Sequence, residues 1–345
     1  MVDVAQLAGV SRMTVSRVIN NDAKVRIETR DAVLAAIREL NFQPNQTARN
    51  LVMAGELRIG IVYSNPSAAF MSDFLIGVFE EATKAGARLI LVRGDNGQAP
   101  SQKELQKLLG TGVHGAVLAP PLGESDQVRA ILRAANLPFA VVAAGRPPGD
   151  AINVRIDDRQ AGQTMARHLL DLGHRRIGFI TGNPDQSASG SRLEGARAAI
   201  AVVEGAELIV AEGAFTYASG LSAAERLLDA EPPPTAIFAS NDDMAAAAVS
   251  VAHRRHLDVP GDLTVVGFDD TTVATTLWPP LTTIRQPVRQ MAAVALDRLM
   301  RVLRSAEPPA EPFSDYVLDH ALMERQSTAP PRSVIATVDK RPLYV

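Results

Sequence analysis

The hydrophobic positions of the first forty residues repeat at helical spacing. Three apolar groups predict three short helices: Val4, Ala5, Leu7 and Ala8; Val15, Val18 and Ile19; and Val33, Leu34, Ile37 and Leu40. Gly9 separates the first helix from the second, and Ser11 stands where its side-chain oxygen can cap the second. The third helix begins at Ile27, and Pro44 prevents its continuation. We therefore expect a small all-α head over residues 1–41.

From Leu57 onward, short apolar runs alternate with amphipathic segments. The apolar runs predict strands at 58–63, 88–92, 115–119, 139–143, 176–181, 207–211, 236–239 and 264–268. The amphipathic segments predict helices at 72–85, 102–109, 125–135, 161–172, 191–203, 218–228 and 244–254. Such alternation is typical of a parallel sheet covered on both faces. Because the pattern starts again after Asp157, we expect two α/β lobes with a ligand cleft beyond the carboxyl ends of their strands.

Composition excludes several classes of protein. Hydrophobic residues make up 46% of the 345, which is enough for large cores. The absence of cysteine excludes disulfides and thiolate metal sites, and the six histidines lack ligand spacing, so we expect no metal. No apolar run reaches transmembrane length, and the N-terminus lacks the order of a signal peptide. These observations predict a cytoplasmic protein that does not contact the membrane.

The charge is distributed unevenly along the chain. The formal net charge is −3, but residues 1–55 carry seven cations against five anions, which leaves −5 on the rest. A mildly basic head on an acidic body suits a small DNA-reading module attached to a domain that does not touch DNA. The second predicted helix also leaves a donor-rich face exposed, of the kind that enters a major groove. An ordinary helical hairpin is the alternative interpretation.

The head resembles the lactose-repressor (LacI/GalR) family of bacterial transcription regulators. The similarity is carried by DVAQLAGVSRMTVSRVIN, followed by LNFQPN and ARNL. It implies a hinge helix over residues 42–55 whose Leu51 wedges into the central base step of the operator, although packing on the body is an alternative. Arg17 is expected to reach a guanine edge, and Arg12 with Met13 to set sequence preference. The full set of expected DNA contacts is Arg12, Met13, Thr14, Ser16, Arg17, Asn20, Asn45 and Leu51.

The resemblance extends through the body in family order. It is carried by LGHRRIGFITG, SRLEG, FTYASG, FASNDDMA, VVGFDD, PPLTTIRQP and ERQSTAPP. It implies a periplasmic-binding-protein-like (type I) effector and dimerisation domain over 56–325. The implied N-lobe covers about 57–155 and 285–312, and the C-lobe about 156–284 and 313–325, with a tail over 326–345. That tail has no leucine heptads, so nothing supports a coiled-coil tetramerisation module.

The expected effector pocket combines planar polar groups with aromatic faces, which suits a sugar. Its candidates are Asn65, Ser67, Phe70, Asp157, Arg192, Phe215, Asn241 and Asp269. Arg192 could instead close the lobes through a salt bridge, and core packing is an equal reading for Phe70. Asp242 and Asp270 follow strands too, but capping of loops is as good an explanation for them. Asp158 stands where the family has Asn, and Trp278 is expected at the cleft rim or a subunit contact.

The sequence therefore predicts a homodimeric regulator, most simply a repressor, that binds a palindromic double-stranded operator. A small-molecule effector, with carbohydrate as the family default, would control operator affinity allosterically. No cofactor and no catalytic residue is expected, since the chain has no Gly-rich phosphate loop and no nucleophile elbow. A sugar-binding protein of a transport system and an α/β enzyme are the alternatives, because a fold does not fix a function.

Overall fold

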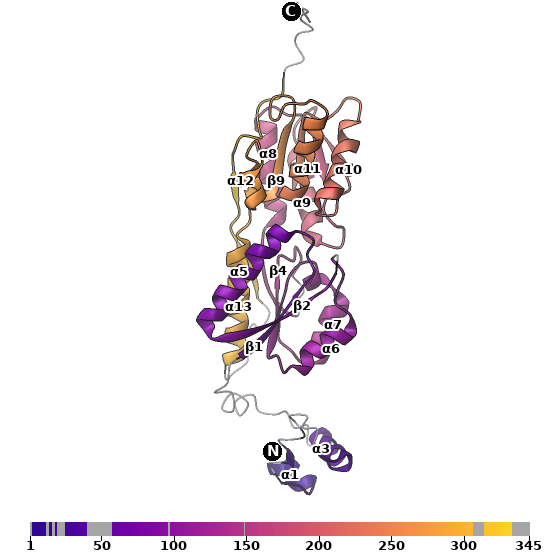
Figure 1. Cartoon of the computed structure of the whole chain (residues 1–345), viewed down its shortest axis with the longest axis vertical. Coiled ribbons are helices and arrows are strands. Elements are labelled where there is room, and N and C mark those ends of the chain that lie inside the picture. The colour runs from indigo at the N-terminus through magenta and orange to yellow at the C-terminus, as the bar shows by residue number, and fades with distance from the viewer. Residues whose placement is uncertain are drawn as a thin grey trace, which may run out of the picture. The chain divides into compact units, whose positions relative to one another are not determined.

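The protein is described by a computed structural model, drawn in Figure 1. The structure describes residues 2–11, 14–15, 18, 25–39, 57–95, 97–147, 149–305 and 314–332. Contacts divide the chain into two compact units, residues 1–56 and residues 57–345.

The first unit is a small helical head. Its described helices are α1 (Val2–Leu7) and α3 (Ile27–Glu39). Val4, Val15, Val18 and Val33 form its buried core, as helical periodicity indicated. The predicted cap at Ser11 is confirmed, because the Ser11 hydroxyl accepts a hydrogen bond from the Thr14 backbone N–H at 3.1 Å.

Two leucines of the head do not face this core as predicted. Leu7 is 48% exposed and Leu34 is 42% exposed. Among the side chains of α3 whose burial the structure describes, Val33 and Ala36 are buried; they lie three residues apart and so share one narrow stripe. The next position along the helix points about 100° away from that stripe, which explains why Leu34 remains outside.

The second unit contains two lobes, each built on a six-stranded sheet. The N-lobe sheet has the order β11-β5-β4-β3-β1-β2 and all its strands are parallel. Its strands are β1 (Leu57–Tyr63), β2 (Ala87–Arg93), β3 (Gly115–Leu118), β4 (Phe139–Val142), β5 (Ile152–Ile156) and β11 (Asp315–Leu318). The helical segments of this lobe are α5 (Ala68–Ala85), α6 (Gln102–Gly110), η1 (Leu122–Glu124), α7 (Asp126–Ala134) and α13 (Val288–Arg304).

The C-lobe sheet has the order β12-β10-β9-β8-β6-β7, with only β12 antiparallel. Its strands are β6 (Arg176–Ile180), β7 (Glu207–Ala211), β8 (Ala236–Ala239), β9 (Thr264–Asp269), β10 (Thr282–Arg285) and β12 (Ala321–Met323). Its helices are α8 (Asp158–Asp171), α9 (Ser187–Ile200), α10 (Tyr217–Leu228), α11 (Asp242–Arg254) and α12 (Thr272–Thr276). The expected pair of α/β lobes is confirmed (Figure 1).

The hydrophobic pattern of the strands explains why helices cover both faces of each sheet. In β1, Ile59 and Ile61 pack in the cluster that contains the buried residues of α5 and α13. Val62, on the opposite face, packs with Leu105 of α6 and Val128 of α7. Successive strand residues point to opposite faces, so a strand that is apolar at nearly every position must be covered twice.

The last crossover and the tail differ from the sequence prediction. We expected the chain to return to the C-lobe near residue 313, but β11 pairs in parallel with β5 of the N-lobe. The return therefore falls between Leu318 and Ala321. Residues 326–332 were expected in a tail, yet Ser327 is fully buried and accepts a hydrogen bond from the Thr282 backbone N–H at 2.9 Å. Edge strands as short and half-exposed as β11 leave almost no hydrophobic signal, which explains the error.

Candidate functional site

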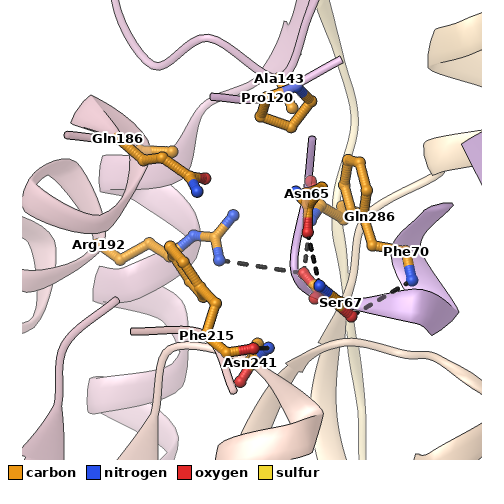
Figure 2. Close-up of a pocket in the computed structure, with 12 residues that line it drawn as sticks. Asn65, Ser67, Phe70, Pro120, Ala143, Gln186, Arg192, Phe215, Asn241 and Gln286 are labelled. Carbon is orange, nitrogen blue, oxygen red and sulfur yellow. Dashed lines mark hydrogen bonds and ion pairs between the residues drawn. The ribbon is translucent and has the colours of Figure 1, made fainter. Parts of the chain in front are cut away.

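A cavity whose unfilled space, open solvent included, amounts to about 340 Å³ lies between the two lobes. The residues around it come from both lobes, as Figure 2 shows: Asn65, Ser67, Phe70, Pro120, Ala143, Gln186, Ala188, Arg192, Phe215, Asn241, Asp269 and Gln286. Asn65 follows β1 and Asn241 follows β8, while Asp269 is the last residue of β9. These are the carboxyl ends of parallel strands, where open α/β sheets bind their ligands.

All the predicted effector residues except Asp157 line this cavity. Asp157 is the exposed N-cap of α8, and its carboxylate accepts a hydrogen bond from the Gln160 backbone N–H at 2.9 Å. An aspartate directly before a helix satisfies one of the free N–H groups of the first turn, so its carboxylate is held there. The prediction for Asp157 is therefore wrong as to position, and the neighbouring Asp158 is the residue that turns inward.

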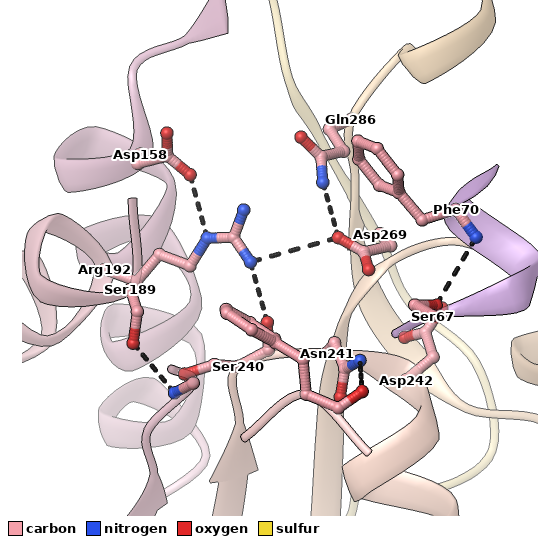
Figure 3. Close-up of polar contacts among 12 residues, drawn as sticks. Ser67, Phe70, Asp158, Ser189, Arg192, Ser240, Asn241, Asp242, Asp269 and Gln286 are labelled. Atoms are coloured by element: carbon pink, nitrogen blue, oxygen red, sulfur yellow. Dashed lines mark hydrogen bonds and ion pairs between the residues drawn. The ribbon is translucent and has the colours of Figure 1, made fainter. Parts of the chain in front are cut away.

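Arg192 is buried and is held from several sides (Figure 3). Its Nε donates to Asp158 Oδ1 at 2.8 Å, and its Nη1 donates to the Ser240 carbonyl at 2.7 Å. The guanidinium also lies over the Phe268 ring, 3.6 Å from the ring centroid. Because Asp158 and Arg192 both belong to the C-lobe, their ion pair does not close the lobes, contrary to one reading of the sequence.

Two glycines bring the helices of this ion pair together. A Cβ on Gly162 of α8 would lie 2.2 Å from the Arg192 carbonyl oxygen, and a Cβ on Gly195 of α9 would lie 1.9 Å from the Arg159 carbonyl oxygen. Helices α8 and α9 therefore cross in backbone contact, which any larger residue at these positions would prevent. This close crossing sets the position of Arg192 relative to Asp158.

Asp269 is held in a strained conformation at the cavity wall. Its φ of 109° is rare for a residue with a side chain, and Ala143 and Phe215 also have positive φ, at 56° and 58°. Strain of this kind costs on the order of 1–3 kcal/mol per residue and collects at functional sites. Asp269 Oδ1 accepts a hydrogen bond from Gln286 Nε2 at 2.5 Å and lies 3.9 Å from Arg192 Nη1. Burial raises the pKa of the Asp269 carboxyl well above its ordinary value, although Arg192 opposes this.

Two cavity residues also cap helices. Asn241 caps α11 by accepting from the Met244 N–H at 3.0 Å, and its amide donates to the Phe215 carbonyl at 3.1 Å. Ser67 caps α5 and donates across the lobes to Asp243 Oδ2 at 2.8 Å. These bonds fix the side chains that face the cavity.

Asp242 and Asp270 do not line the cavity. Asp242 is buried and accepts hydrogen bonds from Thr271 and Thr283, and burial raises its pKa to about 7 against the lowering effect of those bonds. Asp270 pairs with Arg285 at 2.7 Å and with Arg325 at 2.5 Å. Both carboxylates therefore stabilise loops, which was the alternative interpretation of the sequence.

The cavity contains two buried polar atoms without partners among the described residues. They are Gln186 Nε2, a donor, and Gln286 Oε1, an acceptor. Leaving such atoms unpaired costs about 1–3 kcal/mol each, so they indicate a ligand that bonds them. Neither glutamine was predicted to line the cavity, and Pro120, Ala143 and Ala188 were not predicted there either. Gln286 directly follows β10, a strand that the sequence reading did not recognise.

Phenylalanine rings form the apolar part of the wall. Phe215 is buried over Gly182, where a Cβ would lie 1.9 Å from its ring. Phe70 both lines the cavity and belongs to the N-lobe core, so core packing is confirmed and its contact with an effector stays a prediction. Trp278 is 75% exposed and does not line the cavity, which leaves the subunit contact or cleft rim as its expected place.

Glu124 joins the two lobes beside the cavity. Its carboxylate, in η1 of the N-lobe, accepts from the Ser187 backbone N–H at 3.0 Å and from the Ser187 hydroxyl at 2.8 Å. It also accepts from the Gly145 N–H at 3.2 Å. Gln186, the N-cap of α9, makes no capping bond with its own side chain, so the other lobe supplies the cap of the helix that carries Arg192.

The expected DNA contacts fall almost entirely outside the described residues. Thr14 is described, and its hydroxyl lies 2.9 Å from the Ser11 hydroxyl. The remaining candidates lie outside the described part of the chain: Arg12, Met13, Ser16, Arg17, Asn20, Asn45 and Leu51. Among the described residues, no helix is long and apolar enough to span a membrane, and no cluster of three or more potential ligands could hold a metal ion.

Comparison with known proteins identifies the family. A model described as "Bacterial regulatory proteins, lacI family" matches residues 1–45, and one described as "Periplasmic binding protein-like domain" matches residues 166–328. The HTH-type transcriptional regulator CelR of Thermobifida fusca is 37% identical over 339 residues, covering 94% of this chain and 96% of CelR.

Solved structures agree with that similarity. A transcriptional regulator CelR–cellobiose complex matches with a TM-score of 0.69 and 32% identity, covering 94% of this chain and 98% of the other. The lac repressor dimer bound to operator and the anti-inducer ONPF matches with a TM-score of 0.69 and 28% identity, covering 95% and 98%. These relatives are regulators and not enzymes. The chain therefore belongs to the LacI family of bacterial transcriptional regulators.

Proposed function

We propose that this protein is a homodimeric, sequence-specific repressor whose affinity for a palindromic operator is controlled by a carbohydrate bound between its lobes. The observation that supports a carbohydrate ligand is the cavity itself, where Arg192 and two glutamine atoms without partners lie beside phenylalanine rings. Paired donors and acceptors suit adjacent hydroxyl groups, and aromatic faces suit the C–H surface of a sugar. The CelR relative in complex with cellobiose supports the same class of ligand.

The proposed DNA interface is the head together with the hinge that follows it. The match of residues 1–45 to the lacI family model supports it, and so does the Ser11 cap that begins the second helix. The lac repressor dimer on its operator supports a two-fold arrangement, in which each head reads one half-site. The proposed base contacts are Arg12, Met13 and Arg17, the phosphate contacts are Thr14, Ser16 and Asn20, and the hinge contributes Asn45 and Leu51.

The proposed mechanism couples the cavity to the hinge through the relative orientation of the lobes. A ligand that prefers one orientation changes the stability of the DNA-bound arrangement, and by linkage DNA changes ligand affinity equally. A coupling of about 1–3 kcal/mol would shift operator affinity about 5- to 150-fold. The cross-lobe bonds of Ser67 and Glu124 are the contacts that such a reorientation would have to break or remake.

The effector half of the proposal is tested by thermal-shift and calorimetric titration with cellobiose, lactose, glucose and ribose. We expect at least one of these sugars to raise the melting temperature. Gln186→Ala should weaken that sugar about 2- to 10-fold, since it removes one hydrogen bond. Gln102→Ala, which changes an exposed glutamine of α6, is the matched control. Equal sugar binding by both variants would remove Gln186 from the site.

The DNA half is tested by fluorescence anisotropy with an operator selected from random sequences. Arg17→Ala should weaken operator more than random DNA; equal weakening would make Arg17 only a phosphate contact. Leu51→Ala should preserve the dimer and sugar binding while weakening operator binding. Unchanged operator affinity would contradict the proposed role of Leu51.

A further inference from the structure

Arg192 is the only cationic side chain that lines the cavity, within the part of the chain that the structure describes. Arginine keeps its proton at any physiological pH, so a buried guanidinium needs a carboxylate beside it. Asp158 Oδ1 supplies this counter-charge at 2.8 Å from Arg192 Nε, and both side chains are about 95% buried. The positive charge of the site is thus balanced before any ligand enters.

We propose that the Asp158–Arg192 pair makes this cavity selective for uncharged saccharides and excludes sugar acids and sugar phosphates. This inference rests on the proposed carbohydrate effector and specifies its chemical class. An anionic ligand would need a cation whose charge is not already paired. The structure offers it only a neutralised guanidinium.

The remaining contacts of Arg192 point the same way. Nε is used by Asp158 and Nη1 by the Ser240 carbonyl, while the Phe268 ring covers one face of the guanidinium. Nη2 makes no hydrogen bond within the described residues, and Nη1 makes one, so N–H groups remain to donate to ligand oxygens. Hydroxyl and ring oxygens can accept these bonds without bringing a net charge into the cavity.

Among the described residues, the other charged side chain that lines the cavity is an aspartate. Asp269 lines the wall and lies 3.9 Å from Arg192 Nη1, and Asp243 is bonded to the wall residue Ser67. Asp158 is the closer counter-charge of Arg192, at 2.8 Å against 3.9 Å for Asp269. Burial raises the pKa of both carboxyls, and the charge of Arg192 opposes that rise. The buried polar atoms without partners belong to the amides of Gln186 and Gln286. Amides are neutral, and they can donate to a hydroxyl group or accept from one.

The residue at position 158 decides whether the charge of Arg192 is balanced. The resemblance described above expects Asn after Asp157, and an amide there would bond Arg192 Nε without cancelling its charge. Asp158→Asn therefore keeps the shape and one acceptor oxygen while it leaves Arg192 positive. Asp157→Asn is a matched control, because it removes an equal charge at the neighbouring position. Asp157 is an exposed N-cap, and Asn is as favourable there as Asp.

The experiment measures binding of ligand pairs that share one ring and differ at C6: glucose with glucuronate and glucose 6-phosphate, and galactose with galacturonate. Cellobiose and lactose extend the neutral series. The full-length wild type, Asp158→Asn and Asp157→Asn are titrated by calorimetry at pH 7.5 and constant ionic strength. Circular dichroism and melting curves establish that each variant is folded.

We expect the wild type and Asp157→Asn to bind a neutral sugar at least about tenfold more tightly than its anionic partner. Asp158→Asn should strengthen the acid by about tenfold or more, since removing a like charge within about 4–6 Å is worth at least one pKa unit of interaction. Wild-type binding of an acid or phosphate as tight as that of its neutral partner would overturn the inference while leaving a carbohydrate effector standing. If Asp158→Asn does not fold, this wild-type comparison still decides the question. If neither series binds, the carbohydrate effector itself fails and the inference falls with it.

Discussion

The buried carboxyl of Asp242 predicts how the stability of the protein depends on pH. Asp242 Oδ2 accepts from the Thr271 N–H at 2.7 Å and from the Thr271 hydroxyl at 3.0 Å, while Oδ1 accepts from the Thr283 hydroxyl at 2.7 Å. Asp242→Asn can keep all three contacts, because the amide oxygen serves Thr271 and the amide nitrogen donates to the Thr283 hydroxyl, which can also accept. The substitution removes the titration without removing the shape.

The sign and size of the effect follow from the two pKa values. Burial raises the pKa of Asp242 from its ordinary value of 3.8 to about 7 in the folded protein. Between these pH values the folded protein holds a proton that the unfolded chain has released. The stabilisation from this proton is full below the unfolded pKa and is lost as the pH rises through about 7, at about 1.4 kcal/mol per pH unit. The whole window of about 3 units corresponds to about 4 kcal/mol.

Urea unfolding followed by circular dichroism at pH 5, 6, 7 and 8 measures this dependence. Since about 2 pH units of the window lie in this range, the wild type should lose about 3 kcal/mol more than Asp242→Asn between pH 5 and pH 8. Asp126→Asn, at a side chain that is 95% exposed, is the control and should follow the wild type. Asp158 and Asp269 also have raised pKa values and remain in all three proteins. Because the charge of Asp242 helps to raise the pKa of Asp269, the difference between slopes reports Asp242 together with this coupling. Identical slopes for wild type and Asp242→Asn would mean that Asp242 is ionised in the folded protein.

Three further substitutions test contacts that position the site. Gly195→Ala should destabilise the body by about 1–3 kcal/mol and abolish sugar binding, because its Cβ would meet the Arg159 carbonyl; Gly190→Ala on the same helix, whose Cβ meets nothing within 4 Å, should be harmless in the same urea and calorimetric assays. Glu124→Gln should weaken sugar binding several-fold in calorimetry, since it removes the negative charge at the start of α9, worth about 0.3–1 kcal/mol; unchanged affinity would show that the bond across the lobes does not matter for closure. Ser327→Ala should cost about 1–3 kcal/mol in urea unfolding by leaving the buried Thr282 N–H without an acceptor, and a loss within error of zero would return residues 326–332 to the status of a tail.

The sequence predicted the parts of the fold whose hydrophobic pattern is strong. The predicted strands 207–211 and 236–239 coincide with β7 and β8, because each is a run of apolar residues between turn signals. Strand β11 escaped prediction because it alternates between exposed and half-buried positions at the edge of a sheet. The role of Ser327 depends on Val265 and Thr282, far away in the chain, and no local pattern could have indicated it.

The cavity was predictable where topology alone decides a position. Asn241 and Asp269 stand at the ends of strands, so the parallel sheet brings them to one edge. Topology did not separate Asp157 from Asp158, because adjacent residues at the start of a helix differ only in which one caps it. The unpaired amide of Gln186 could not be foreseen either, since whether a buried group has a partner depends on the packing of both lobes.

The cap that Glu124 places on α9 makes lobe closure observable in solution. The Glu124 carboxylate protects two backbone amide protons. It accepts from the Ser187 N–H across the cleft and from the Gly145 N–H within its own lobe. When the lobes separate, Ser187 loses its acceptor, while the Gly145 bond within the N-lobe can persist. Hydrogen–deuterium exchange at these two amides would therefore report lobe closure: exchange at Ser187 gives the signal and exchange at Gly145 the internal reference.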